Sequence, residues 1–155
     1  MNTHGHRTLR RLTVLLVLAG VFLMPAWTAW AKAPDRPYVV LGGQGFSVEI
    51  ANTETAQARG LMFRTHMAAD HGMLFIYPDA QPRDFWMKNT LIPLDILFFD
   101  AHRRLINVSA DTLPCKRDPC PVYASAAPAQ YVLELNAGTA QKLGIRPGNR
   151  LRLRR

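Results

Sequence analysis

The chain has 155 residues, of which 48% are hydrophobic and 19% are charged, and its 19 lysines and arginines outnumber its 11 acidic residues. This length and composition fit one globular domain with its own core and exclude a repeat or low-complexity architecture. The formal net charge of +8 is consistent with an anionic partner, or simply with a basic protein surface that is solvated by water.

The first 31 residues have the features of a secretory signal peptide. Three arginines precede an apolar run over residues 12–24, and Ala29-Trp30-Ala31 then supplies the small residues of a cleavage site. A retained membrane anchor is the alternative, but the run is shorter than the about 20 residues that span a bilayer. We predict cleavage after Ala31 and an exported protein, either periplasmic or secreted.

The remaining chain divides into an arm and one domain. Residues 32–44 predict an N-terminal arm, and residues 45–155 predict a single β-rich domain. Without the three arginines of the signal peptide, 16 basic and 11 acidic residues leave a net charge of about +5. In residues 150–155 arginines alternate with leucines, as on a strand with one solvated face. An anionic partner such as a membrane surface is the alternative interpretation, whereas an exported protein is not expected to bind nucleic acid.

The first half of the domain predicts strands on either side of a short helix. Alternating or continuous apolar residues predict strands over residues 46–51 and 72–77, and a polar turn is predicted over 78–83. Between the strands, Asn52 or Thr53 caps a helix that carries Glu54 in its first turn and ends at Gly60.

The second half predicts further short strands. They are expected over residues 84–88, 94–99, 105–109 and 131–135 and at the C-terminus, with a hairpin turn over 100–104, a proline-bearing loop over 111–128, a short helix over 138–143 and a turn over 146–149. The fold class is therefore mainly β, a compact single-domain sandwich or partly closed barrel with one or two short helices. Parallel βαβ architecture is not expected, because most connections are too short for a crossover helix.

The two cysteines, Cys115 and Cys120, predict a local disulfide, because paired cysteines in an exported protein are usually oxidised. A redox couple and half of a metal site are the alternatives. The spacing is wider than that of a redox motif, and no second pair of ligands lies nearby.

Four blocks of sequence identify a family. They are Ala58-Arg59-Gly60-Leu61-Met62-Phe63-Arg64, Gly72-Met73-Leu74-Phe75, Phe85-Trp86-Met87-Lys88-Asn89-Thr90 with Pro93-Leu94-Asp95, and Val132-Leu133-Glu134-Leu135 with Gly138. In this order the blocks resemble the domain of unknown function 192 family, over about residues 46–153. The resemblance implies a compact, largely β domain that is often exported, and it implies no known reaction, ligand or catalytic residue.

Polar residues inside an apolar run point to a candidate site. Asp95 begins a strand whose two faces are both apolar, and a buried carboxylate needs a cation or several N–H donors. In one interpretation Asp95 is an internal clamp that pairs with Lys88 or Arg59 and with the backbone of the preceding connection. In the other, the five residues Arg59, Trp86, Lys88, Asn89 and Asp95 line a ligand pocket, with Trp86 as an apolar wall.

Two other functions have weaker signals. Asp95 could act as a general acid or base if solvent reached it. The second function is copper binding by a cluster of possible ligands, although its spacing matches no recognisable metal site. The cluster consists of Met62, His66, Met67, His71 and Met73. Glu134 is interpreted as an outward strand residue, because it lies in an ordinary apolar alternation.

The sequence thus favours an exported, monomeric, non-enzymatic binding or interaction module without a cofactor or metal. Its partner is expected to be a small molecule or another component of the cell envelope, and the membrane is met only through an uncleaved signal peptide.

Overall fold

The computed structural model describes Met1 and residues 36–154, so the predicted signal peptide and the start of the arm lie outside the described residues. The elements are β1 (Tyr38–Leu41), β2 (Gln44–Ala51), α1 (Glu54–Arg59), β3 (His71–Gln81), β4 (Asp84–Trp86), β5 (Leu94–Phe99), β6 (Leu105–Thr112), β7 (Val122–Ala124), β8 (Ala129–Asn136), α2 (Thr139–Lys142) and β9 (Arg152–Arg154). The predicted mainly β class with two short helices is confirmed.

One seven-stranded sheet dominates the domain. Its strand order is β6-β5-β8-β3-β2-β1-β9, and β4 pairs with β7 in a separate two-stranded ribbon. The sheet curls without closing into a barrel. At one point its edges meet, because Leu105 N–H donates to the Asn149 carbonyl at 2.8 Å and Leu151 N–H donates to the Arg103 carbonyl at 2.9 Å.

Most predicted elements are present, with a few differences. The helix α1 begins after Thr53, whose hydroxyl accepts the Ala56 N–H, and ends at Gly60, as predicted. The polar turn expected over 78–83 is wrong, because β3 continues to Gln81. β2 and β3 pair in parallel through α1, contrary to expectation, since residues 52–70 are long enough for one crossover.

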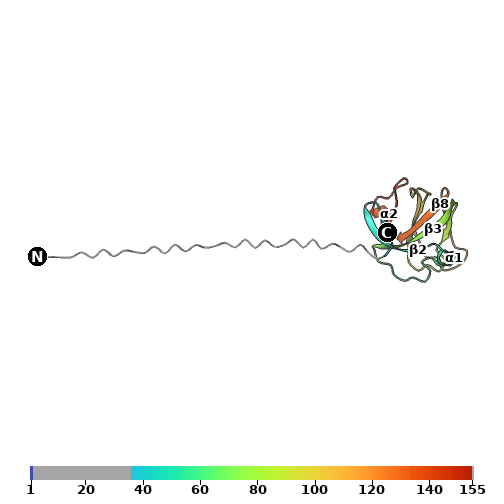
Figure 1. Cartoon of the computed structure of the whole chain (residues 1–155). Helices are drawn as coiled ribbons and strands as arrows, with labels where there is room; N and C mark the ends of the chain where they lie inside the picture. The colour runs from blue at the N-terminus through green and yellow to red at the C-terminus, as the bar shows by residue number, and fades with distance from the viewer. Residues whose placement is uncertain (2–35, 155) are drawn as a thin grey trace. The chain divides into compact units, whose positions relative to one another are not determined.

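The core has two parts, one on each face of the sheet. β5 is buried along its whole length, so its alternate side chains enter both parts. Leu97 and Phe99 pack in the first part with Ala140 of α2, and Ile96 and Phe98 pack in the second. Figure 1 shows α1 and α2 on opposite sides of the central strands β2, β3 and β8.

Every core side chain of the described residues lies between positions 39 and 151. The β4–β7 ribbon contributes Phe85 to the second part of the core. None of the described helices is long and apolar enough to cross a membrane.

Candidate functional site

Asp95 is a structural anchor at the start of β5. Its side chain is 0% exposed. One carboxylate oxygen, Oδ1, accepts the backbone N–H of Asp111 at 2.9 Å and that of Gly138 at 3.2 Å. The other, Oδ2, accepts the N–H of Ala140 at 2.8 Å. Three donors therefore compensate the buried carboxylate, and they tie β5 to β6 and to the start of α2.

Backbone N–H groups hold Asp95, but the three donors are not the predicted partners, which were Lys88 or Arg59 and the connection that precedes the strand. Within residues 36–154, neither Lys88 nor Arg59 forms an ion pair with Asp95. The donors come from backbone 16 to 45 positions further along the chain, which is a tertiary arrangement. A carboxylate sealed from solvent in this way cannot exchange protons with a substrate, which argues against Asp95 as a general acid or base.

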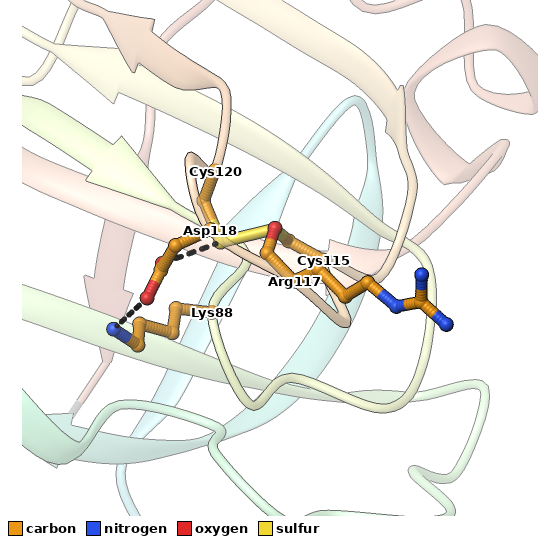
Figure 2. The surroundings of a disulfide bond; sticks show 5 residues. All are labelled: Lys88, Cys115, Arg117, Asp118 and Cys120. Carbon is orange, nitrogen blue, oxygen red and sulfur yellow. Dashed lines mark hydrogen bonds and ion pairs between the residues drawn. A yellow bond between two sulfur atoms is a disulfide. The ribbon is translucent and has the colours of Figure 1, made fainter.

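Lys88 contacts the disulfide loop. Its Nζ lies 2.8 Å from Oδ2 of Asp118, as Figure 2 shows, and 5.4 Å from the centre of the Trp86 ring. The predicted disulfide between Cys115 and Cys120 is confirmed, with Cα atoms 5.7 Å apart. Since Lys88 and Asp118 are both solvent-accessible, their pair positions the loop more than it stabilises the fold.

Asn89 shapes the turn between β4 and β5. Its φ of 57° lies in the left-handed region that asparagine tolerates better than most residues. Its carbonyl accepts the N–H of Phe63 at 2.7 Å, which joins this turn to the segment after α1.

A narrow slot lies between the end of α1 and β4. Its volume is about 40 Å³. Eleven residues line it: Gln57, Ala58, Arg59, Gly60, Leu61, Met62, Phe75, Phe85, Trp86, Thr90 and Glu134. Apolar and polar side chains both line the slot, and Trp86 at β4, predicted as an apolar wall, is 49% exposed.

Glu134 is the buried acid of this slot. It sits on the central strand β8 opposite Met73 and Ile96, and its side chain is 5% exposed. Among residues 36–154, its Oε2 is the one buried side-chain oxygen or nitrogen without a hydrogen-bond partner. Burial raises the pKa of Glu134 to about 8, so the group is mostly protonated at neutral pH.

The interpretation of Glu134 as an outward residue is wrong. β8 lies between β3 and β5, and the face that carries Glu134 is covered by the second part of the core. A signal was present in the sequence, because Val132, Leu133 and Leu135 make this a continuous apolar run of the kind found in strands buried on both faces.

The structure separates the five predicted ligand residues. Arg59 and Trp86 line the slot. Lys88 and Asn89 do not line the slot but contact residues that do. Lys88 lies near the Trp86 ring, and the Asn89 side chain lies near the Met62 sulfur. Asp95 points to the other face of the sheet, toward α2. A ligand role for these residues stays a prediction.

The five possible copper ligands do not gather at one place, and His66 is exposed. Met67 and Met73 pack in the second part of the core, and Met62 lines the slot. His71 is partly buried, and both its ring nitrogens face protein groups: Nδ1 lies 2.9 Å from Ser47 Oγ and Nε2 lies 3.0 Å from Glu49 Oε1. Within the described part of the chain, no group of three or more His, Cys, Asp and Glu side chains is placed to hold a metal.

The hydrogen-bonded side chains of Ser47, His71 and Glu49 have the composition of a catalytic triad. Its carboxylate, however, is shared with Arg64 at 2.8 Å, and the open hollow beside it is lined by Glu49, Arg64 and His71 but not by Ser47. Burial raises the pKa of Glu49, but the hydrogen bonds from His71 and Arg64 outweigh it and hold this pKa below its ordinary value. The cluster therefore works as an ion-pair network across the parallel β2–β3 junction.

The fold and the slot define a small, curled β domain in which a buried glutamate and a half-exposed tryptophan line the same slot. Residues 38–153 match the sequence profile of the DUF192 family, described as "Uncharacterized ACR". The chain belongs to this family, as the four sequence blocks predicted.

Two solved structures are similar along most of the domain. A protein of unknown function from Novosphingobium aromaticivorans is 39% identical, with a TM-score of 0.70 over 74% of this chain and 83% of that one. A protein from Sinorhizobium meliloti, named as a proposed transcription regulator, is 37% identical, with a TM-score of 0.69 over 76% of this chain and 92% of that one. No curated protein matches the chain.

Proposed function

We propose that this protein is an exported, non-enzymatic binding module whose ligand places a polar group against Glu134 in the slot. The unpaired Oε2 of Glu134 carries this proposal. A buried polar atom without a partner costs free energy, and a ligand that supplies the partner recovers it. Perturbed acids of this kind concentrate at functional sites.

The family blocks converge on the same slot. Every lining residue except Gln57 belongs to one of the four blocks that identify the family, and each block contributes at least one. Segments that are far apart in the chain therefore meet at Glu134. This convergence favours a site shared by the fold over an accident of packing in one chain.

The lining supports binding better than catalysis. Glu134 and Arg59 are the two ionisable side chains among the lining residues, and the slot offers Glu134 neither a second carboxylate nor a histidine as its partner in proton transfer. One buried acid in a slot with several apolar walls can still orient a ligand by a single strong hydrogen bond.

Exposed apolar residues lie on the segments around the mouth of the slot. The large hydrophobic side chains exposed within residues 36–154 are Phe63, Trp86, Leu91, Leu113 and Val122. Trp86 is paired with Val122 across the ribbon, and Phe63 follows α1 and is bonded to the turn at Asn89. Such a surface can hold the remainder of a ligand that is longer than the slot.

Export is supported by the predicted signal peptide together with the disulfide, since disulfides persist in oxidising compartments. The ligand is accordingly expected among the small molecules and polymers of the cell envelope.

The test uses residues 33–155, because the core lies within positions 39–151 and relatives little longer than the matched region have been solved as folded proteins. Trp86 is the one tryptophan after residue 31 and reports directly on the mouth of the slot. A library of small envelope-type compounds is screened by Trp86 fluorescence and by nuclear magnetic resonance. Compounds that bind the native protein and Glu54→Gln, an exposed control, should fail to bind Glu134→Gln. Hits that bind all three proteins equally would contradict the proposal.

A further inference from the structure

We propose that the group accepted by the slot is a primary alkylammonium at the end of an aliphatic chain, recognised by the Glu134 carboxylate and the aromatic walls. This inference rests on the proposed binding function and specifies its ligand class.

The walls suit a cation on a short apolar stem. Three aromatic side chains, Phe75, Phe85 and Trp86, line the slot together with Leu61 and Met62. Phe75 and Phe85 pack edge to face with ring centres 4.9 Å apart, so their positions are fixed before a ligand arrives. Aromatic walls around a carboxylate are a recurring way to bind alkylammonium groups, because ring faces attract a cation and exclude water.

The floor supplies the counter-charge. Within residues 36–154 no cation pairs with Glu134. When an R–NH3⁺ group enters, the Glu134 proton leaves to solvent and the resulting carboxylate accepts N⁺–H donors. Since the pKa of Glu134 is about 8, the need to ionise this group at pH 7 lowers the binding constant only about tenfold. A charge-assisted hydrogen bond readily offsets this loss.

The hydrogen-bonding capacity of the nitrogen selects its substituents. The slot, about 40 Å³ in volume, has space for more than one water-sized group, so an ammonium with its first methylene fits it. A primary ammonium can donate N⁺–H to the Glu134 carboxylate, whereas a trimethylammonium group has no donor to offer.

The rim favours a second group on the ligand. Arg59 at the end of α1 lines the slot and is exposed, so it can donate to a carbonyl or carboxylate of the ligand. A ligand with an amine and an acceptor separated by several methylenes satisfies both Glu134 and Arg59. A free amino acid with a terminal amine and a lysine side chain in a peptide share this chemistry.

The experiment compares four probes of equal chain length on residues 33–155: butylamine, 1-butanol, butyrate and butyltrimethylammonium. Binding is followed by Trp86 fluorescence and by calorimetry at pH 7 in two buffers of different ionisation enthalpy. Butylamine should bind at least tenfold more tightly than the other three and release about one proton. Glu134→Gln should lose this preference, and Glu54→Gln should keep it.

The source of the amine is read in a second arm. Free lysine, a peptide with one internal lysine and the same peptide with that lysine acetylated are compared. Tighter binding of the unmodified peptide than of free lysine assigns the site to a protein partner, and the reverse order assigns it to a small molecule. The acetylated peptide should bind at least tenfold more weakly in either case.

Two results would overturn the amine assignment. The first is that butyrate binds most tightly with proton uptake, or that butanol binds most tightly with no proton change, and that Glu134→Gln loses this binding. The binding function would then stand, with another ligand class. The second is that none of the four probes binds. This result would also overturn the amine assignment, while the library screen tests the binding function separately.

Discussion

Replacement of Glu134 by glutamine should change how stability depends on pH. The folded protein holds the Glu134 proton up to a pKa of about 8, whereas the unfolded chain releases it near 4.5. Stability contributed by the neutral carboxyl is therefore fully present below about pH 4.5 and is lost as the pH rises toward about 8. Glutamine has nearly the same shape and no proton to release, so the variant lacks this loss.

The magnitude follows from linkage. In the window between the two pKa values, the free energy of unfolding of the native protein falls by about 1.4 kcal/mol per pH unit relative to the variant. From about pH 5.5 to about pH 7.5, the advantage of Glu134→Gln should grow by about 2.7 kcal/mol. For a domain of this size that corresponds to a difference in Tm that widens by roughly 10 °C.

The assay is thermal unfolding of residues 33–155 at several pH values, followed by circular dichroism. Glu54→Gln serves as the matched control, because Glu54 is exposed in the first turn of α1 and its curve should run parallel to that of the native protein. A gap between Glu134→Gln and the native protein that stays constant with pH would refute the reasoning. It would mean that the carboxylate is ionised in the folded state and has a partner.

Four further variants test the structural assignments by urea unfolding. Asp95→Ala should cost on the order of 3 kcal/mol, because it leaves three backbone N–H groups without their acceptor; a stable variant would contradict the anchor. Trp86→Ala should cost only about 1 to 2 kcal/mol and Phe85→Ala about 3 to 5 kcal/mol, because Trp86 is half exposed and Phe85 is buried; equal costs would contradict this difference. Replacing both Cys115 and Cys120 by serine should lower stability by about 2 kcal/mol while the fold is retained, since the disulfide closes a short loop; unchanged stability under oxidising conditions would refute it.

Local signals were sufficient for elements that depend on neighbouring residues. The cap at Thr53 and the end of α1 at Gly60 are set within a few residues of chain, and the short apolar run 94–99 has the length of a strand buried on both faces. The extension of β3 to Gln81 was not predicted, because it depends on pairing with Ala129 of β8, which is distant in sequence. β1 was missed although it forms a tight hairpin with β2, because residues 32–44 were interpreted as an arm.

The same distinction explains the candidate site. The sequence identified Asp95 as buried and in need of donors, but Ala140, its closest donor, lies 45 positions away. Lys88 was offered as a partner because it is near in sequence, yet it turns outward to Asp118. Burial can be deduced from a local apolar pattern, whereas the identity of a partner depends on how the sheet curls.

Asp95 and Glu134 show why burial alone does not identify a functional acid. Both lie on central strands among apolar residues, and both side chains are at least 95% buried. Asp95 receives three backbone donors, so its charge is compensated by the fold. Glu134 has an oxygen without a partner and faces a slot that can admit one. The acid that the fold leaves unsatisfied is the better candidate for recognition, because a ligand can supply only the hydrogen bonds that the protein does not already make.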